Sequence, residues 1–219
     1  MTPPDAIFST GLFEEGRCAM PLQSGALLLG GFAAPEADAL LADIRLIAAM
    51  APFRNMVTPG GWPMSVEMTN CGSVGWVTDW TGYRYDPVDP QSGKPWPAMP
   101  DIFRRLAVRA AEVAGYAGSD PDSCRMNRYE PGSRLSLHQD RNERDFAAPI
   151  VSVSLGLPAT FLWGGAARSD KATRVGLFHG DVVVWGGPAR LTFHGIETLR
   201  GGDGPAGEVR YNLTFRTAR

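Results

Sequence analysis

The sequence predicts an α+β protein, mainly β, in which helices support one face of a jelly roll. Gly 26 and Pro 18 in a chain of 219 residues favour a turn-rich fold over a helical bundle. Two segments in the first half have helical periodicity, whereas after residue 122 short apolar runs alternate with Gly, Pro, Asp and Asn turns. The length suits one core, so we expect a single domain over 1–219.

Two helices are expected, at 35–50 and 100–114. Each begins with a proline in its first turn, where the missing N–H costs nothing. Their apolar stripes are Leu40, Leu41, Ile44, Ile47 and Ala48 in the first, and Ile102, Phe103, Leu106, Ala110 and Val113 in the second. We expect both stripes to pack against a sheet.

The predicted strands are 25–32, 124–129, 150–155, 160–163, 173–178, 181–185, 191–194 and 209–216. Residues 1–22 are expected to be a loose lead-in, and 57–97 an irregular, Gly- and Pro-rich stretch. That stretch holds the aromatic residues Trp62, Trp76, Tyr83, Trp80, Tyr85 and Trp96. It is interpreted either as a layer covering the sheet or as a binding lid, while 123–216 forms the core of the jelly roll.

Composition limits the location and the partners. The net charge of −2 argues against a whole-surface electrostatic grip on nucleic acid, although it leaves room for a local basic patch. Cys18, Cys71 and Cys124 are widely spaced without a Cys-x-x-Cys pair, which indicates core filling in a reducing compartment. No signal peptide or membrane-spanning run is evident, so a cytoplasmic monomer is expected.

His138-Gln139-Asp140, followed by His194, has the residue types of a metal site. Two neutral imidazoles and one carboxylate can hold one face of an octahedral Fe(II), leaving three positions for a cosubstrate and O2. His138 and Asp140 are two residues apart, so on an extended segment they share a face. His-x-Asp alone is a weak signal, and the alternative is a polar surface loop.

A second pattern of the same kind, His179-Gly180-Asp181, lies between two apolar runs. Its Gly and Asp are typical of a tight turn between strands. We therefore interpret it as a turn and not as the metal pair.

Arginines alternate with apolar residues near the end of the chain. Period two places Arg210, Asn212, Thr214 and Arg216 on one face of a strand. Such a face is usually solvated, but two arginines and an amide could instead line the interior and bind a cosubstrate's carboxylates. The same spacing occurs in Arg125, Asn127 and Tyr129.

Taken together, these motifs resemble the AlkB family of Fe(II)/2-oxoglutarate-dependent nucleic-acid demethylases. The resemblance runs from about Phe53 to Arg216. It is carried by 56–61 (MVTPGG), 127–129 (NRY), 135–140 (LSLHQD), 149–156 (PIVSVSLG), 180–187 (GDVVVWGG) and 210–216 (RYNLTFR). The combination is far more specific than any one of its parts.

The resemblance implies a double-stranded β-helix (jelly-roll) core with two supporting helices and an N-terminal nucleotide-recognition lid over 57–97. His138, Asp140 and His194 would be the Fe(II) ligands, Arg210 would bind the far carboxylate of 2-oxoglutarate, and Arg216 would lie near its keto-acid end. The other cosubstrate residues implied are Asn127, Tyr129, Ser152, Trp185 and Asn212.

The implied reaction uses O2 and 2-oxoglutarate to demethylate 1-methyladenine- or 3-methylcytosine-type bases in single- or double-stranded DNA, or in RNA. It releases formaldehyde, succinate and CO2, and it repairs alkylation damage directly. A flipped base needs a flat partner, and the resemblance gives Trp76 one face of it and His138 the other. The remaining substrate contacts implied are Thr58, Met64, Tyr83, Arg134, Ser136, Arg141, Asn142 and Arg168.

The chain departs from the family's pattern at Asn142, where an acidic residue is expected near the base. A neutral amide cannot compensate a cationic base as a carboxylate can, and Glu143 or Asp145 are the candidates to replace it. Two other functions remain: an Fe(II)/2-oxoglutarate oxygenase acting on a small molecule or protein side chain, and a jelly-roll binding module without iron.

Overall fold

The structure, a computed structural model, describes residues 19–219, so Cys18 and most of the predicted lead-in lie outside the described residues. Its helices are α1 (Ala37–Met50) and α2 (Asp101–Val113), with short 3-10 turns at Ala34–Glu36 and Gly187–Ala189. The strands are β1 (Ala19–Gln23), β2 (Ala26–Leu29), β3 (Arg54–Val57), β4 (Pro63–Gly72), β5 (Gly75–Asp79), β6 (Gly82–Asp86), β7 (Ser123–Tyr129), β8 (Leu135–His138), β9 (Ile150–Gly156), β10 (Ala159–Trp163), β11 (Thr173–Leu177), β12 (Val182–Trp185), β13 (His194–Ile196) and β14 (Arg210–Arg216).

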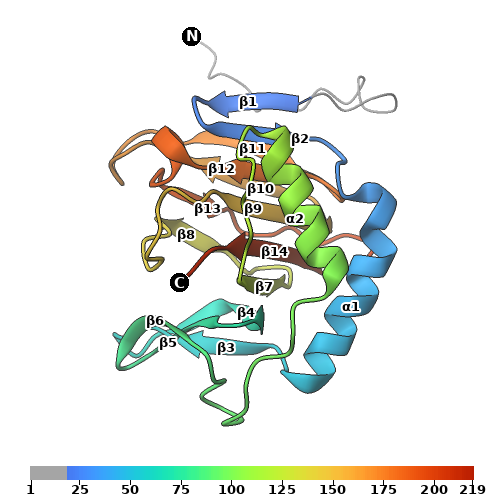
Figure 1. Cartoon of the computed structure of the whole chain (residues 1–219), viewed down its shortest axis with the longest axis vertical. Helices are drawn as coiled ribbons and strands as arrows, with labels where there is room; N and C mark the ends of the chain where they lie inside the picture. Colours follow the sequence, from blue (N-terminus) through green and yellow to red (C-terminus); the bar gives the residue numbers. More distant parts are fainter. Residues whose placement is uncertain (1–18) are drawn as a thin grey trace.

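Two antiparallel sheets form the jelly roll that the sequence predicts. The larger has eight strands in the order β1-β2-β12-β9-β14-β7-β4-β3, and the smaller has four in the order β11-β10-β13-β8. In Figure 1 the large sheet runs from β1 and β2 at one end of the molecule to β3 and β4 at the other. Strands far apart in the sequence, such as β9 and β14, are thereby paired.

Both helices cover the same side of the large sheet (Figure 1). Leu40, Ile44 and Phe103 from the helices share one hydrophobic cluster with alternate residues of β9 and β14, such as Val153 and Leu213. The expected packing of the helices is therefore confirmed. One stripe residue was assigned wrongly, since the side chain of Val113 at the end of α2 is 57% exposed.

A second hydrophobic cluster fills the space between the two sheets. It includes Phe161 and Trp163 of β10, Ile196 of β13, and Val183 and Trp185 of β12. The alternation along each large-sheet strand thus sends one set of side chains to the helices and the other to the inter-sheet space. Polar residues on that second face become interior residues.

The prediction of an irregular stretch over 57–97 is wrong in part. β4 lies wholly within it and pairs with β7 along six positions, from Glu67 opposite Arg128 to Gly72 opposite Ser123. β5 and β6 form a separate two-stranded hairpin at this end of the molecule (Figure 1). Pairing with a distant strand overrides the weak local signal of β4, which holds only Val66 and Thr69 as β-branched residues.

Other boundaries also differ from the expectation. Residues 19–22 of the predicted lead-in belong to β1, which pairs with β2. The strand expected at 191–194 begins at His194, and β8 was not predicted as a strand. Six strands precede α2, so the order is not simply helices followed by strands. In the described part of the chain, neither helix is long and apolar enough to cross a membrane.

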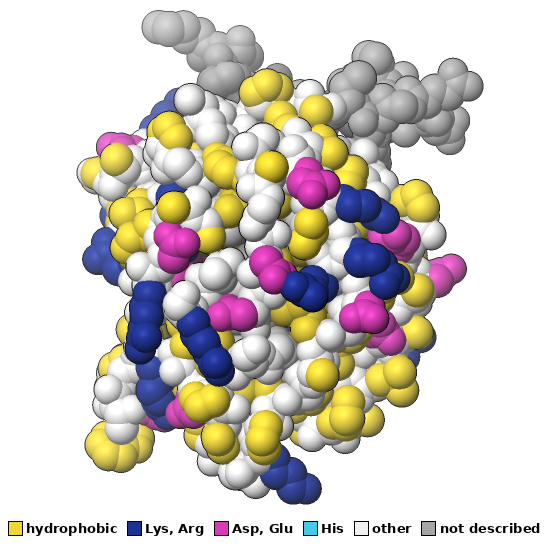
Figure 2. Space-filling model, in the orientation of Figure 1, with side chains coloured by type: hydrophobic (Ala, Val, Ile, Leu, Met, Phe, Trp, Pro, Cys, Tyr) yellow, Lys and Arg dark blue, Asp and Glu magenta, His cyan; other side chains and the backbone are white. Residues whose placement is uncertain are grey.

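Figure 2 shows the face that carries the helices. Acidic and basic side chains are interspersed on it, without a continuous basic surface. This agrees with the net charge of −2, and any basic surface for a polyanion must be sought elsewhere.

Candidate active site

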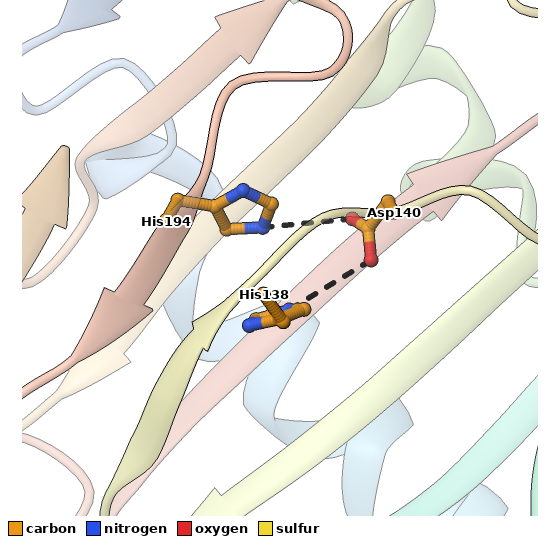
Figure 3. Close-up of side chains that lie close together, drawn as sticks. All are labelled: His138, Asp140 and His194. Atoms are coloured by element: carbon orange, nitrogen blue, oxygen red, sulfur yellow. Dashed lines mark ion pairs between the residues drawn. The ribbon is translucent and has the colours of Figure 1, made fainter. Parts of the chain in front are cut away.

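Three side chains of the predicted metal site meet in the space between the sheets. His138 ends β8, Asp140 follows it in the loop, and His194 begins β13, the partner strand on which it lies directly opposite His138. Their potential ligand atoms all lie within 4.8 Å of one another. Figure 3 shows both imidazoles directed at the Asp140 carboxylate, with His138 Nε2 3.8 Å from Oδ1 and His194 Nε2 3.7 Å from Oδ2.

Backbone carbonyls fix the tautomer of both histidines. Nδ1 of His138 lies 2.9 Å from the carbonyl oxygen of Ser136, and Nδ1 of His194 lies 3.0 Å from that of Thr192. A carbonyl only accepts, so each Nδ1 carries the proton and each Nε2 keeps a lone pair. Burial, together with the neighbouring His194, lowers the pKa of His138 to about 3, and burial also lowers the pKa of His194. Both imidazoles are therefore neutral at physiological pH, and each can offer its Nε2 lone pair to a metal ion.

Asp140 is held as a carboxylate. Burial alone would raise its pKa, but the charge of Arg216, followed by smaller contributions, holds that pKa well below the usual range. Arg216 Nη2 donates to Asp140 Oδ2 at 2.7 Å. Two neutral imidazoles and one anion are thus present in the protonation states that a divalent cation requires.

A second carboxylate supports this arrangement from behind. The buried Glu143 pairs with Arg216 at 3.2 Å and with Arg190 at 3.1 Å, and it accepts a hydrogen bond from Tyr85 of β6. Arg190 also donates to the backbone carbonyl of Asp140 at 2.8 Å. The iron-ligand loop is therefore tied both to the core and to the β5–β6 hairpin.

The polar face of β14 points into the inter-sheet space and not into water. Arg210, Asn212, Thr214 and Arg216 all line the cavity beside the metal triad. Arg210 is 1% exposed, its guanidinium lies over the Tyr129 ring at 4.9 Å, and Nη2 donates to Ser154 at 3.1 Å. Its Nε and Nη1 have no partner among the described residues.

A buried guanidinium with two N–H-bearing atoms unpartnered and no ion pair among the described residues indicates a missing anion, because such a charge is costly to bury alone. A dicarboxylate that reached from the triad to Arg210 would supply that anion, so the residues present fit iron with 2-oxoglutarate. The predicted cosubstrate residues Tyr129, Ser152 and Trp185 line this cavity as well. Asn127 does not line it, but its amide donates to Asn212 at 3.0 Å and so orients that residue.

A larger cleft of about 800 Å³ opens beside the cavity. All the residues predicted to contact the substrate line it, namely Thr58, Met64, Trp76, Tyr83, Arg134, Ser136, Arg141, Asn142 and Arg168. His138 and Asp140 belong to both the cavity and the cleft. The cleft therefore ends at the metal triad.

Trp76 has more contacts than the sequence indicates. It is 8% exposed, its ring stacks on Tyr83 with centroids 5.7 Å apart, and the Arg125 guanidinium lies 4.9 Å from its centroid. Its Nε1 donates to Asn142 Oδ1 at 3.1 Å. A base in the cleft would meet a ring that is already oriented by these three neighbours.

The competing His-x-Asp pair is a turn, as expected. Gly180 has φ +84°, and Asp181 accepts a hydrogen bond from the Phe178 backbone at 2.8 Å. His179 Nδ1 accepts from the Gly156 backbone at 3.0 Å. This histidine is engaged away from the triad.

Sequence reasoning missed several residues of the site. Arg125 lines both the cavity and the cleft, Phe161 lines the cavity, and Trp62 and Phe193 line the cleft. The shared period of 125, 127 and 129 was the one signal that could have placed Arg125. Glu143 and Asp145 were the candidates to supply the carboxylate that is missing at Asn142. Glu143 is buried and paired with Arg190, and Asp145 does not line the cleft.

Comparison with known proteins agrees with this geometry. A family model described as the 2OG-Fe(II) oxygenase superfamily matches residues 15–216. The chain therefore belongs to that superfamily, and it is an Fe(II)- and 2-oxoglutarate-dependent dioxygenase that uses O2.

Its relatives narrow the assignment. The alpha-ketoglutarate-dependent dioxygenase AlkB of Escherichia coli (strain K12) is 57% identical over 199 residues, which cover 90% of this chain and 92% of that protein. The tRNA demethylase abh1 of Schizosaccharomyces pombe is 32% identical over 142 residues, covering 63% of this chain and 46% of that protein. The solved structure of OsALKBH1 has a TM-score of 0.77 at 28% identity and covers 90% of this chain and 100% of its own. Within the superfamily, the chain is a member of the AlkB family.

Proposed function

We propose that this dioxygenase oxidatively demethylates N-alkylated bases of the 1-methyladenine and 3-methylcytosine type in DNA or RNA, as direct repair of alkylation damage. One observation carries the proposal. The cleft that holds Trp76 and Tyr83 ends on His138 and Asp140, so a flat group inserted there reaches the metal triad. Its volume of about 800 Å³ suits a nucleotide-sized ligand.

The residues of this chain bind and orient the reactants. His138, Asp140 and His194 would hold Fe(II), and Arg210 would receive the far carboxylate of 2-oxoglutarate. Arg216 keeps Asp140 charged and fixed. Fe(II) held there would, with 2-oxoglutarate and O2, supply the oxidation that releases the N-methyl carbon as formaldehyde, leaves hydrogen on the base nitrogen and converts 2-oxoglutarate to succinate and CO2.

The base would be flipped out of the strand into the cleft, between Trp76 and His138. Stacking of this kind contributes about 1–3 kcal/mol per base. Around the opening, Arg134, Arg141 and Ser136 are exposed, and such side chains are suited to phosphate oxygens. This local basic surface is compatible with the acidic chain as a whole, and we assign 57–97 as the nucleotide-recognition lid.

We further propose a cytoplasmic monomer. Cys71 and Cys124 lie opposite each other on β4 and β7 and are free and buried, which suits a reducing compartment.

The test is turnover of a single-stranded oligonucleotide carrying one 1-methyladenine or 3-methylcytosine, with Fe(II), ascorbate and 2-oxoglutarate. Formaldehyde and succinate should form in equal amounts, and the substrate should lose one methyl group by mass spectrometry. His138→Ala or Asp140→Ala should abolish both products.

His179→Ala is the matched control, because this histidine belongs to the other His-x-Asp pair and lies in a turn away from the triad. It should retain normal turnover. Activity in His138→Ala, or equal loss in His179→Ala, would refute the ligand assignment. Turnover of methylated amino acids or small molecules, but of no oligonucleotide, would instead support the small-molecule or protein oxygenase.

A further inference from the structure

Arg125 is a buried cation that the machinery described so far does not use. It lies on β7, is 5% exposed, and lines both the cosubstrate cavity and the substrate cleft. Among residues 19–219 its Nε has no hydrogen-bond partner. Its one close oriented contact is the face of Trp76, at 4.9 Å.

The charges around the cleft are strongly asymmetric. Four arginines line it, Arg125, Arg134, Arg141 and Arg168, against a single carboxylate, Asp140. That carboxylate is paired with Arg216 and belongs to the metal triad. No free carboxylate therefore faces a base in the cleft.

Asn142, at the position where the family's pattern has an acidic residue, carries a neutral amide in place of a carboxylate. Asn142 Oδ1 accepts a hydrogen bond from Trp76 Nε1 at 3.1 Å, and its amide carries no negative charge. Glu143, one residue further on, is buried and paired with Arg190 and Arg216. Neither can neutralise a positive charge on the substrate.

This matters because methylated bases differ in charge. Bases of the 1-methyladenine and 3-methylcytosine type carry a positive charge on the ring. Bases of the 3-methylthymine and 1-methylguanine type are neutral and present a carbonyl oxygen beside the methylated nitrogen. A guanidinium repels the first kind and donates to the carbonyl of the second.

We propose that Arg125 is a specificity-determining residue that, together with the neutral Asn142, shifts this enzyme toward neutral, carbonyl-bearing N-methylated bases. The inference rests on the proposed demethylase function and deepens it. Arg125 would donate to the base carbonyl from beside Trp76, and this contact would satisfy its Nε–H, which has no partner among residues 19–219.

Arg125 also lines the cosubstrate cavity, so a contact with 2-oxoglutarate is the alternative to a contact with the base. If it served 2-oxoglutarate, its removal would raise the KM for 2-oxoglutarate and lower turnover of every base alike. If it serves the base, the KM for 2-oxoglutarate stays constant and the ratio between bases changes.

The experiment measures kcat/KM on four otherwise identical single-stranded oligonucleotides, containing 3-methylthymine, 1-methylguanine, 1-methyladenine or 3-methylcytosine. The wild-type chain is compared with Arg125→Leu, Arg125→Lys and Asn142→Asp. Arg125→Leu should lower the ratio of neutral to cationic turnover about tenfold or more, because it removes a charged hydrogen-bond donor to the base carbonyl. Asn142→Asp, at an exposed position, should shift the ratio in the same direction without disturbing the core.

Arg125→Lys keeps the charge and should recover part of the ratio. Arg134→Leu is the matched control: it removes a cleft arginine from the exposed opening and should weaken all four substrates alike. A ratio that stays within twofold in both Arg125→Leu and Asn142→Asp overturns the inference, as does a change confined to the KM for 2-oxoglutarate. Wild-type inactivity on all four oligonucleotides would overturn the proposed function itself, and the inference with it.

Discussion

Arg210 offers a test of the cosubstrate site that can be read without any turnover. Among residues 19–219 its Nε and Nη1 are buried without partners, and each unmade hydrogen bond costs about 1–3 kcal/mol. Against this stand one bond to Ser154 and the face of Tyr129, which contribute about 1.5–3 and 0.5–2 kcal/mol. These contributions nearly cancel, so Arg210→Met should change the free energy of unfolding of the metal-free protein by less than about 1 kcal/mol.

The matched control is Arg190, another buried arginine that is fully engaged by Glu143 and by the backbone carbonyls of Asp140 and Ala148. Arg190→Met leaves Glu143 short of one partner and should cost about 3–5 kcal/mol. Urea denaturation in the presence of a chelator measures both variants.

The affinity for 2-oxoglutarate should follow the opposite order. Truncating one partner of a buried charge pair costs at least about 2 kcal/mol, so Arg210→Met should weaken binding by about 30-fold or more. Anaerobic calorimetry with Mn²⁺ in place of Fe(II) measures it. The reasoning is refuted if Arg210→Met destabilises the metal-free protein as much as Arg190→Met does while 2-oxoglutarate binds normally.

Three further predictions concern the triad and the cleft. Asp140→Asn should lower the affinity for the metal. It should also destabilise the metal-free protein by about 3–5 kcal/mol, because Arg216 loses its nearest anion. A thermal unfolding temperature unchanged from wild type would contradict this prediction. Trp76→Ala should weaken oligonucleotide binding about tenfold or more and leave the affinity for 2-oxoglutarate near normal. Fluorescence anisotropy measures the first and calorimetry the second. The reverse result would make Trp76 structural or part of the cosubstrate site. The folded-state pKa of His138, about 3, lies below its unfolded value of 6.5, so its contribution to stability is complete above pH 6.5 and is lost as pH falls toward 3. Urea denaturation of the metal-free protein between pH 7 and 5 should therefore show a decline that is shallower in His138→Gln. Equal slopes in the two proteins would contradict a neutral His138 ring in the folded state.

The sequence carries the strand pattern and the triad because both follow from local rules. Period two on 210–216 predicts which arginines share a face, and the structure confirms that this face is interior. The period of two could not decide whether this face contacts water or the protein interior, because the same alternation fits both. That choice depends on the four-stranded sheet that covers this face of the larger sheet.

Residues whose role depends on distant partners escaped prediction. In the sequence, Glu143 is one more charged residue among polar neighbours. The fold brings Tyr85, Arg190 and Arg216 into contact with it. β4 was missed for a related reason, since its register with β7 comes from pairing across the fold and not from its own composition. The roles given to individual cleft residues stay predictions until variants are measured.

The hydroxyl of Tyr85 joins the β5–β6 hairpin to Glu143, and through Arg216 to Asp140 of the metal triad. The hairpin and the triad are therefore joined by one chain of hydrogen bonds and ion pairs. A transplanted hairpin without a tyrosine at position 85 would remove the hydroxyl that donates to the buried Glu143 carboxylate. Redesign of the hairpin has to keep this tyrosine, or it alters the surroundings of the metal triad as well.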